Sequence, residues 1–191
     1  MKGSKTKTRI LEEAVKLFAD KGYDAVTVEM IAEAVGIKAP SLYKHYRSKQ
    51  DIFQSIIGEM ERRDAENASE SGVPEAPIED APEAYEDTAE DDLLDFSRKM
   101  FRYWTEDGFA SAFRRMLTVE QYRDREMNDL YHQYLGKGPL KYTADILGSE
   151  EEALSLYAPM FLLYSVYDNT DDKEKVYEML EEHLETWRKK R

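Results

Sequence analysis

Residues 27–49, TVEMIAEAVGIKAPSLYKHYRSK, restrict the fold of this chain more than any other stretch. Thr27 is suited to cap a helix, because its hydroxyl can accept a hydrogen bond from an amide of the first turn. Gly36 stands where that helix must stop and can adopt the left-handed backbone of a sharp turn. Pro40 then suits the first turn of a second, shorter helix. The helix between these signals repeats apolar residues at helical spacing, namely Val28, Ile31, Ala32 and Val35.

The second helix of this pair is expected to run to about residue 46 and to bury one face only. Leu42 and Tyr46 share that face by their i, i+4 spacing, so both are expected to lie in the core. The remaining faces carry hydrogen-bonding or cationic side chains, namely Lys38, Ser41, Tyr43, Lys44 and His45. A short polar rod held across a supporting helix is the helix-turn-helix arrangement that enters the major groove of DNA.

The charge of the chain is divided unevenly along its length. The formal net charge of −13 would by itself argue against a polyanionic partner, because phosphate repels acidic proteins. Residues 1–50, however, hold ten Lys and Arg against six Asp and Glu, whereas the rest of the chain has a balance of −17. This division favours a DNA-facing head on an acidic body, although small charge asymmetries also arise by chance.

Composition excludes several classes of protein. The chain has no cysteine, so disulfides, iron–sulfur clusters and thiolate zinc sites are excluded. Apolar runs such as residues 160–164 are far shorter than the roughly 20 residues of a membrane span, and the N-terminus has no apolar signal segment. We therefore expect a soluble, cytoplasmic protein without a membrane partner.

The remaining sequence predicts an all-α protein with about nine helices and no strand. A polar arm precedes a helix at 8–21, and Ser48 with Asp51 forms a capping box that opens a helix running to about residue 66. Further helices are expected around 93–104, 109–117, 124–135, 139–147, 150–167 and 172–188. Asp171 is expected to cap the last helix, and Pro159 is expected to kink the one before it.

The predicted domains follow from these elements. Residues 1–50 form a helix-turn-helix DNA-binding domain, with the motif itself at about 27–46, and 51–66 form a connecting helix. Residues 67–87 are rich in Pro, Ser and acidic residues and are expected to form an acidic loop, which is a solvated linker or, alternatively, a lid or a partner-binding segment. Residues 88–191 form a C-terminal body.

Residues 9–57, in particular LFADKGYDAVTVEMIAEAVGI and SLYKHYRSKQDIF, resemble the tetracycline-repressor (TetR) family of transcriptional regulators. The resemblance implies a three-helix DNA-binding head joined by a fourth helix to a body that binds an effector and dimerises. Thr27 and Lys49 match positions that contact phosphate. The recognition segment is matched by Lys38, Ala39, Pro40, Ser41, Tyr43, Lys44 and His45.

The resemblance also implies how such a protein works. We expect a homodimer formed through the helices at about 150–167 and 172–188, bound to a near-palindromic DNA operator. The expected function is that of a ligand-responsive repressor that an unknown small-molecule effector releases from DNA. The alternative is a DNA-binding protein of the same family that has no such effector and is controlled by a protein partner.

The body is rich in aromatic residues that suit a pocket for a flat or cationic molecule. The candidate ligand-binding residues are Tyr103, Trp104, Phe113, Arg114, Tyr122 and Tyr164. For each aromatic residue the alternative is ordinary core packing, and for Arg114 with Arg115 it is an exposed, solvated pair.

Catalytic and metal-binding patterns are not found in the sequence. His132 and His183 have no second ligand at a suitable spacing, so structural roles are favoured over a metal site. The sequence holds no GxSxG or HExxH motif, and residues 136–138 are too short for a phosphate-binding loop. We therefore expect neither an enzyme nor a cofactor.

Overall fold

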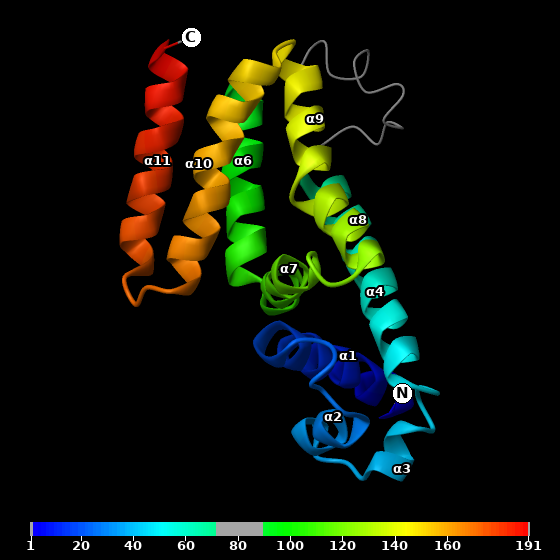
Figure 1. The fold of residues 1–191 in the computed structure, drawn as a ribbon. Helices are drawn as coiled ribbons and strands as arrows, with labels where there is room; N and C mark the ends of the chain where they lie inside the picture. The colour runs from blue at the N-terminus through cyan, green and yellow to red at the C-terminus, as the bar shows by residue number, and fades with distance from the viewer. Residues whose placement is uncertain (1, 72–89, 191) are drawn as a thin grey trace. The chain divides into compact units, whose positions relative to one another are not determined.

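The computed structural model describes residues 2–71 and 90–190, and within them it is helical without strands (Figure 1). These two ranges contain nine helices of eight or more residues and one four-residue turn of helix. The all-α class predicted from the sequence is therefore confirmed. The described residues fall into two compact units, each of which combines segments that are distant in the sequence.

The first unit comprises Met1–Asn67 and Gly108–Tyr131. Its helices are α1 (Lys2–Lys21), α2 (Val28–Val35), α3 (Ala39–Leu42), most of α4 (Lys49–Ser71), α7 (Gly108–Glu120) and the start of α8 (Arg125–Tyr134). Helix α1 packs against both α2 and α7, as Figure 1 shows. Helices α1, α2, α3, α4 and α7 all contribute side chains to the core of this unit. Side chains with at most 2% exposure include Ile10, Phe18, Ile31, Leu42, Phe53, Ile56, Phe113 and Met116.

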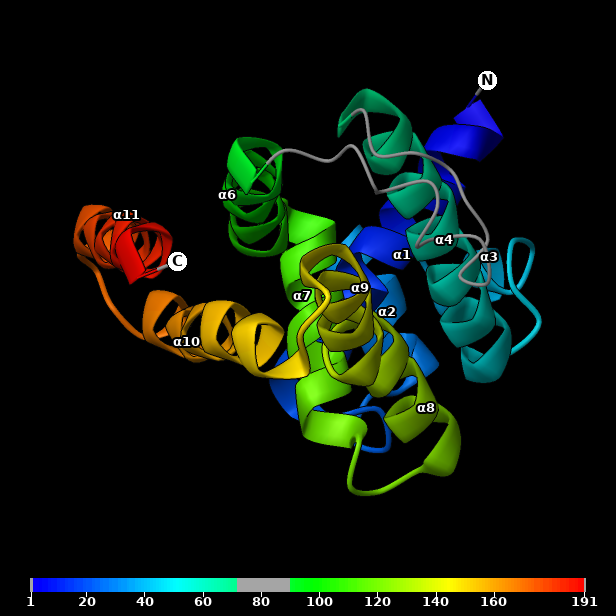
Figure 2. The same cartoon turned by 90° about the horizontal axis from the view of Figure 1, so that it is seen from above.

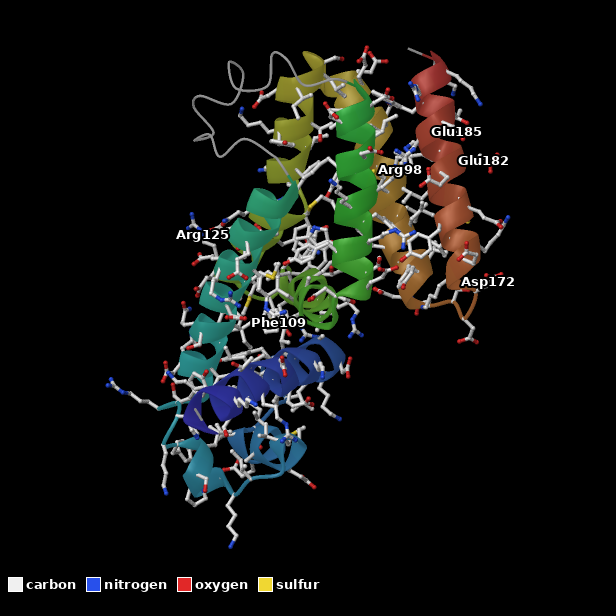
Figure 3. The ribbon with its side chains drawn as sticks, turned by 180° about the vertical axis from the view of Figure 1, so that it is seen from behind. Arg98, Phe109, Arg125, Asp172, Glu182 and Glu185 are labelled. Atoms are coloured by element: carbon white, nitrogen blue, oxygen red, sulfur yellow. The ribbon has the colours of Figure 1, made fainter. Side chains whose placement is uncertain are left out.

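The second unit comprises Ala68–Asp107 and His132–Arg191. Its main helices are α6 (Glu90–Glu106), α9 (Lys137–Leu147), α10 (Glu150–Asp168) and α11 (Lys173–Lys190). Helix α10 contacts α6, α9 and α11, and it lies next to α11 in both ribbon views (Figure 2). Figure 3 shows Arg98 directed from α6 toward α11, where its Nε lies 2.9 Å from Oε2 of Glu181.

These units do not coincide with the domains expected from the sequence. Residues 108–131 were expected in the C-terminal body, yet they pack with the helix-turn-helix. Periodicity along a helix reports which face is buried but does not identify the helix that covers it. Because the units are defined by packing, the functional boundaries at residues 50 and 88 stay a prediction.

Two helices extend further than the sequence predicted. Helix α1 begins at Lys2 rather than after a polar arm, and the Tyr46 hydroxyl donates to the Lys7 carbonyl at 3.3 Å, a tertiary contact that supports this early turn. Helix α4 continues through Ser71, because the first helix-breaking proline stands at position 74. The rest of the predicted acidic loop, residues 72–87, lies outside the described residues.

The last two helices lie close to the predicted ranges. Helix α10 runs from Glu150 through Pro159 to Asp168, against a prediction of 150–167, and the kink at Pro159 stays a prediction. The cap of α11 is Asp172 rather than Asp171, because Oδ1 of Asp172 accepts a hydrogen bond from the Lys175 amide at 3.0 Å. Two adjacent aspartates give the same sequence signal, and only the backbone conformation decides which of them caps the helix.

Candidate nucleic-acid interface

The supporting helix of the motif has the ends that the sequence predicted. Thr27 lies in an extended conformation, and its Oγ1 accepts a hydrogen bond from the Met30 amide at 3.3 Å. Gly36 has a φ of +75°, and the Ile37 amide donates to the Ala32 carbonyl at 2.9 Å. This left-handed glycine closes α2 and turns the chain toward α3. The predicted cap and stop are therefore confirmed.

The recognition helix is shorter than predicted. Helix α3 ends at Leu42, and residues 43–45 form turns instead of continuing the helix to residue 46. The amides of Lys44 and His45 donate to the carbonyls of Ser41 and Leu42 at 3.3 and 2.8 Å. These are i to i−3 hydrogen bonds, which wind the backbone more tightly than an α-helix. Sequence spacing does not distinguish this winding from a regular helix over so few residues.

The two faces of this segment are separated as predicted. Leu42 and Tyr46 are buried, whereas the Tyr43 side chain is 51% exposed. Lys38, Pro40 and Lys44 are also exposed, and Ala39, Ser41 and His45 are partly exposed. All seven predicted contact residues of the recognition segment therefore lie on one short stretch with accessible side chains. Thr27 is exposed at the start of α2.

The start of α4 is fixed by the predicted capping box. The Asp51 amide donates to Oγ of Ser48 at 3.1 Å, and the Arg47 amide donates to Oδ2 of Asp51 at 2.7 Å. The carboxylate thus reaches back one residue beyond the Ser48 cap itself. This pair joins the end of the recognition segment directly to α4.

Lys49 holds the turn between α1 and α2. Its Nζ donates to the carbonyl of Tyr23 at 2.7 Å and to that of Val26 at 3.0 Å, with the Asp24 carbonyl at 3.4 Å. The same ammonium lies 4.2 Å from the centroid of the Tyr23 ring. The sequence predicted a phosphate contact for Lys49 and not this internal role. The phosphate contact stays a prediction.

Glu120 holds the same turn from the other side. Its Oε1 accepts a hydrogen bond from the Tyr23 amide at 2.9 Å, and Nη1 of Arg123 lies 3.3 Å from the same oxygen. Glu120 is 3% exposed. Sequence reasoning missed this residue, although a signal was present. Glu120 follows Phe113, Met116 and Leu117 at helical spacing, so an acid occupies the apolar face of its helix.

Tyr23 itself is anchored by its ring and its hydroxyl. The ring centroid lies 5.1 Å from that of Phe18 and 5.4 Å from that of Phe53, and the hydroxyl donates to Oε1 of Gln50 at 2.8 Å. Burial, followed by the charge of Asp24, raises the pKa of Tyr23. The phenol therefore stays neutral and remains a donor.

Tyr46 is neutral for the same physical reason. Burial, followed by the charge of Asp51, raises the pKa of Tyr46 to about 12. Its protonated hydroxyl is the donor to the Lys7 carbonyl, and Nζ of Lys7 lies 5.3 Å from the ring centroid. The end of the recognition segment is thereby tied to the basic first turns of α1.

Replacing Gly22 with alanine is expected to lower the free energy of unfolding by about 1–2 kcal/mol. Gly22 has a φ of +81°, and an added Cβ would lie 3.0 Å from both Oε1 of Glu120 and Nη1 of Arg123. The measurement is chemical denaturation with an unchanged m-value.

Gly58→Ala is the matched control, because a Cβ at Gly58 meets nothing within 4 Å. Alanine in that helix is expected to stabilise slightly. An equally stable Gly22→Ala variant would contradict a tightly held turn.

The predicted ligand-binding residues are divided between the two units. Tyr103, Trp104 and Tyr164 belong to the second unit, where Trp104 and Tyr164 are buried. The rings of Tyr103 and Trp104 lie 5.4 Å apart, and Tyr164 stacks on Phe101 with a centroid distance of 5.1 Å. These contacts are those of a packed aromatic core, so the alternative of core packing accounts for them without a ligand.

The other three candidates lie in the first unit. Phe113 and Arg114 are buried in α7, whereas Tyr122 is 86% exposed. The alternative of an exposed arginine pair is wrong for Arg114. Arg115 is partly exposed, and its Nη1 lies 3.3 Å from Oδ1 of Asp20 on α1. The assignment of these six residues to a ligand pocket stays a prediction.

A small open cleft of about 200 Å³ lies between α10 and α11. Its lining is Glu152, Ser155, His183, Thr186, Trp187 and Lys190. Nε2 of His183 donates to the Leu156 carbonyl at 2.8 Å, and Nε1 of Trp187 donates to Oγ of Ser155 at 3.0 Å. Both hydrogen bonds join α10 to α11, which gives His183 the structural role that the sequence favoured.

The helices of the two described ranges include none that combines the length and the apolar character of a bilayer-spanning segment. Within the same ranges, no group of three or more His, Asp and Glu side chains is arranged to hold a metal ion.

The N-terminal residues of the chain are similar in sequence to known bacterial regulatory proteins. Residues 10–56 match the family of bacterial regulatory proteins of the tetR family. Over 51 residues the chain is 41% identical to the biofilm operon icaADBC HTH-type negative transcriptional regulator IcaR of Staphylococcus epidermidis, and 43% identical to IcaR of Staphylococcus aureus strain Newman. These matches cover 27% of this chain and 28% and 27% of those proteins. The likeness to them therefore concerns little more than a quarter of their length.

Solved structures share the fold over nearly the whole chain. The fatty acid degradation regulator FadR from Bacillus halodurans has a TM-score of 0.63 at 15% identity and covers 95% of this chain and 94% of its own. A putative TetR-family transcriptional regulator from Mesorhizobium loti has a TM-score of 0.56 at 17% identity and covers 98% and 96%. Residues 10–56 are therefore identified as a DNA-binding domain of the tetR family of bacterial regulatory proteins, and nearly the whole chain shares its all-helical fold with these solved structures.

Proposed function

We propose that this protein is a transcriptional repressor that binds a near-palindromic operator as a homodimer in the cytoplasm and is released from it by a small-molecule effector. The observation that carries the proposal is the two-faced recognition segment. Its buried residues Leu42 and Tyr46 fix it to the core, while Tyr43 and Lys44 are exposed beside it. Such a segment holds its exposed side chains on a packed support, which suits insertion into a groove of DNA.

The residue types of this surface suit distinct contacts with DNA. Thr27, Tyr43 and Lys38 can bind phosphate oxygens and so position the protein on the duplex. Ser41, Lys44 and the small Ala39 can approach base edges in the major groove and so contribute to sequence selection. His45 and Pro40 complete the accessible stretch. Two such surfaces in a dimer would occupy successive major grooves about 34 Å apart.

Binding to the operator is expected to weaken steeply as salt increases. Each phosphate neutralised contributes a slope of about −0.9 to the plot of log affinity against log salt, so four contacts would lower the affinity about a hundredfold between 50 and 200 mM salt. The duplex is first selected from a random pool by the protein itself, and its affinity is then measured by fluorescence anisotropy. A flat plot would contradict the phosphate contacts.

A homodimer through α10 and α11 is supported by their exposed apolar residues. Leu154 and Leu162 on α10 are more than half exposed, and with the exposed Ala158 they recur every four residues along one face. Met179 on α11 is likewise exposed. Large apolar side chains that recur on one helical face are a feature of interfaces, because their exposure to water is unfavourable.

The proposal of a small-molecule effector is supported by the fold and by other proteins that share it. One such structure is described as a gamma-butyrolactone receptor, with a TM-score of 0.55 at 16% identity, and another as a putative fatty acid metabolism regulator from Clostridium perfringens, with a TM-score of 0.60 at 19% identity. A small molecule bound in the body would release DNA only if it bound the DNA-free conformation more tightly.

A thermal-shift screen of metabolites separates the two candidate modes of control. A compound that raises the melting temperature and also displaces the selected duplex would support a small-molecule effector. Protein partners captured by the DNA-bound form, together with no stabilising compound, would favour the alternative of control by a protein partner.

A further inference from the structure

We propose that Glu120 is a positioning residue for DNA binding, which couples α7 to the recognition segment through the turn between α1 and α2. The coupling to DNA rests on the proposed function, whereas the contact itself is a property of the first unit. The turn comprises residues 22–26, and its two sides are held by opposite charges. A carboxylate from α7 accepts the Tyr23 amide, and an ammonium from the start of α4 binds three carbonyls.

This arrangement restrains the turn more than either contact alone. The amide of Tyr23 points toward Glu120, and the carbonyl of Tyr23 points toward Lys49. Rotation of these peptide groups would break charge-assisted hydrogen bonds on both sides at once. Charge-assisted hydrogen bonds are roughly twice as strong as neutral ones. The turn is therefore held in one orientation relative to both α7 and α4.

The burial of Glu120 indicates a specific role for its carboxylate. The side chain occupies the apolar face of α7, where a leucine would continue the pattern of Met116 and Leu117. Removing a carboxylate from water is costly unless hydrogen bonds and an opposite charge compensate. Here the Tyr23 amide and Arg123 provide them. The carboxylate of Glu120 therefore serves to bind the turn and does not contribute to apolar packing in the core.

The turn leads directly into the DNA-binding helices. The Val26 amide donates to the Tyr23 carbonyl at 3.3 Å, and Thr27 caps α2 immediately afterwards. Helix α1 lies between α7 and α2 in Figure 1 and packs against both. A displacement of α7 along α1 would therefore pull on Tyr23, and through it on the start of α2. Glu120 is in this way the point at which α7 sets the orientation of the motif.

The direct test compares Glu120→Ala with Glu120→Gln and with the control Asp20→Asn. Asp20 is also a carboxylate between α1 and α7, but it contacts Arg115 and not the turn. Hydrogen exchange of the Tyr23 amide, resolved by NMR, should be about tenfold faster in Glu120→Ala. Glutamine keeps an acceptor without the charge, so its exchange should be intermediate. Asp20→Asn should leave the Tyr23 amide unchanged.

The functional test uses the duplex that the wild-type protein selects from a random pool. Affinity for this duplex should fall about tenfold in Glu120→Ala and less in Glu120→Gln, at a temperature where circular dichroism shows both to be folded. Affinity of Asp20→Asn should equal that of the wild type. If Glu120 positions the turn, the variants should have the same order in the exchange rate of the Tyr23 amide and in the loss of DNA affinity. A general loss of stability would instead accelerate exchange at many amides together.

The outcomes separate the inference from the proposed function. An unchanged Tyr23 amide in Glu120→Ala would overturn the contact itself. Faster exchange with unchanged DNA affinity would overturn the coupling while leaving the proposed function in place. A wild-type protein that selects no duplex would overturn the proposed function and with it the coupling, and the exchange result would still establish the contact. If Glu120→Ala does not fold, Glu120→Gln gives the same comparisons.

Discussion

Replacing Leu162 with glutamate is expected to convert a dimer into a monomer that keeps its helical structure. Leu162 is 64% exposed on α10, so a charge at this position leaves the fold of the single chain intact. In a two-fold interface the substitution occurs twice, and each buried charge costs about 2 kcal/mol or more. The dissociation constant of the dimer should therefore rise about a thousandfold. Sedimentation equilibrium measures it, and circular dichroism checks the helix content.

Val119→Glu provides the matched control for this experiment. Val119 is 41% exposed on α7 in the first unit, so the same charge replaces an accessible apolar residue outside the proposed interface. This variant should dimerise as the wild type does. A Leu162→Glu variant that remains dimeric would place the interface elsewhere, and a monomeric wild type would contradict the proposed dimer. The operator affinity of the monomeric variant should also fall, because the two half-sites are then no longer bound together.

The features that the sequence predicted correctly depend on neighbouring residues. The cap at Thr27 and the left-handed Gly36 are decided within a few residues, so the side chain alone indicates the structure. Leu42 and Tyr46 are also close in the sequence, and their i, i+4 spacing correctly predicted the buried face of the recognition segment. These signals located the motif and separated its exposed residues from its core.

Features that depend on contacts between distant segments were not predictable in this way. Lys49 meets a turn about 25 residues earlier in the chain, and Glu120 meets the same turn from 97 residues later. A carboxylate on an apolar helical face indicates a buried partner but does not identify it. The placement of α7 in the first unit has the same cause, because its apolar face fits several possible neighbours.

The candidate ligand-binding residues also depend on contacts that the sequence does not show. Aromatic side chains at helical spacing have the same pattern whether they line a pocket or fill a core. Tyr164 stacks on Phe101 within the second unit, and Tyr122 is exposed in the first. The aromatic pattern of the sequence made both tyrosines equally good candidates for a ligand pocket. Only the arrangement of the neighbouring helices distinguishes them, and this arrangement is not encoded in the spacing along one helix.

Replacing Tyr43 with alanine is expected to weaken operator binding about tenfold to a hundredfold without lowering the melting temperature. The side chain is 51% exposed, so its removal leaves little of the core unfilled. A contact to phosphate or to a base edge contributes about 1–3 kcal/mol, which corresponds to this loss of affinity. Lys44→Ala is expected to act in the same direction, because Lys44 is exposed on the same segment.

Two further tyrosines make the experiment on Tyr43 specific. Tyr122→Ala removes an exposed ring outside the recognition segment and should change neither operator binding nor melting. Tyr46→Ala removes a buried ring and the hydroxyl that donates to Lys7, so it should lower the melting temperature as well as the affinity. A Tyr43→Ala variant that melts like Tyr46→Ala would show that the buried and exposed faces of the segment had been exchanged. Unchanged binding by a stable Tyr43→Ala would instead place the DNA contacts on other residues, because removing a side chain that contacts DNA should lower the affinity.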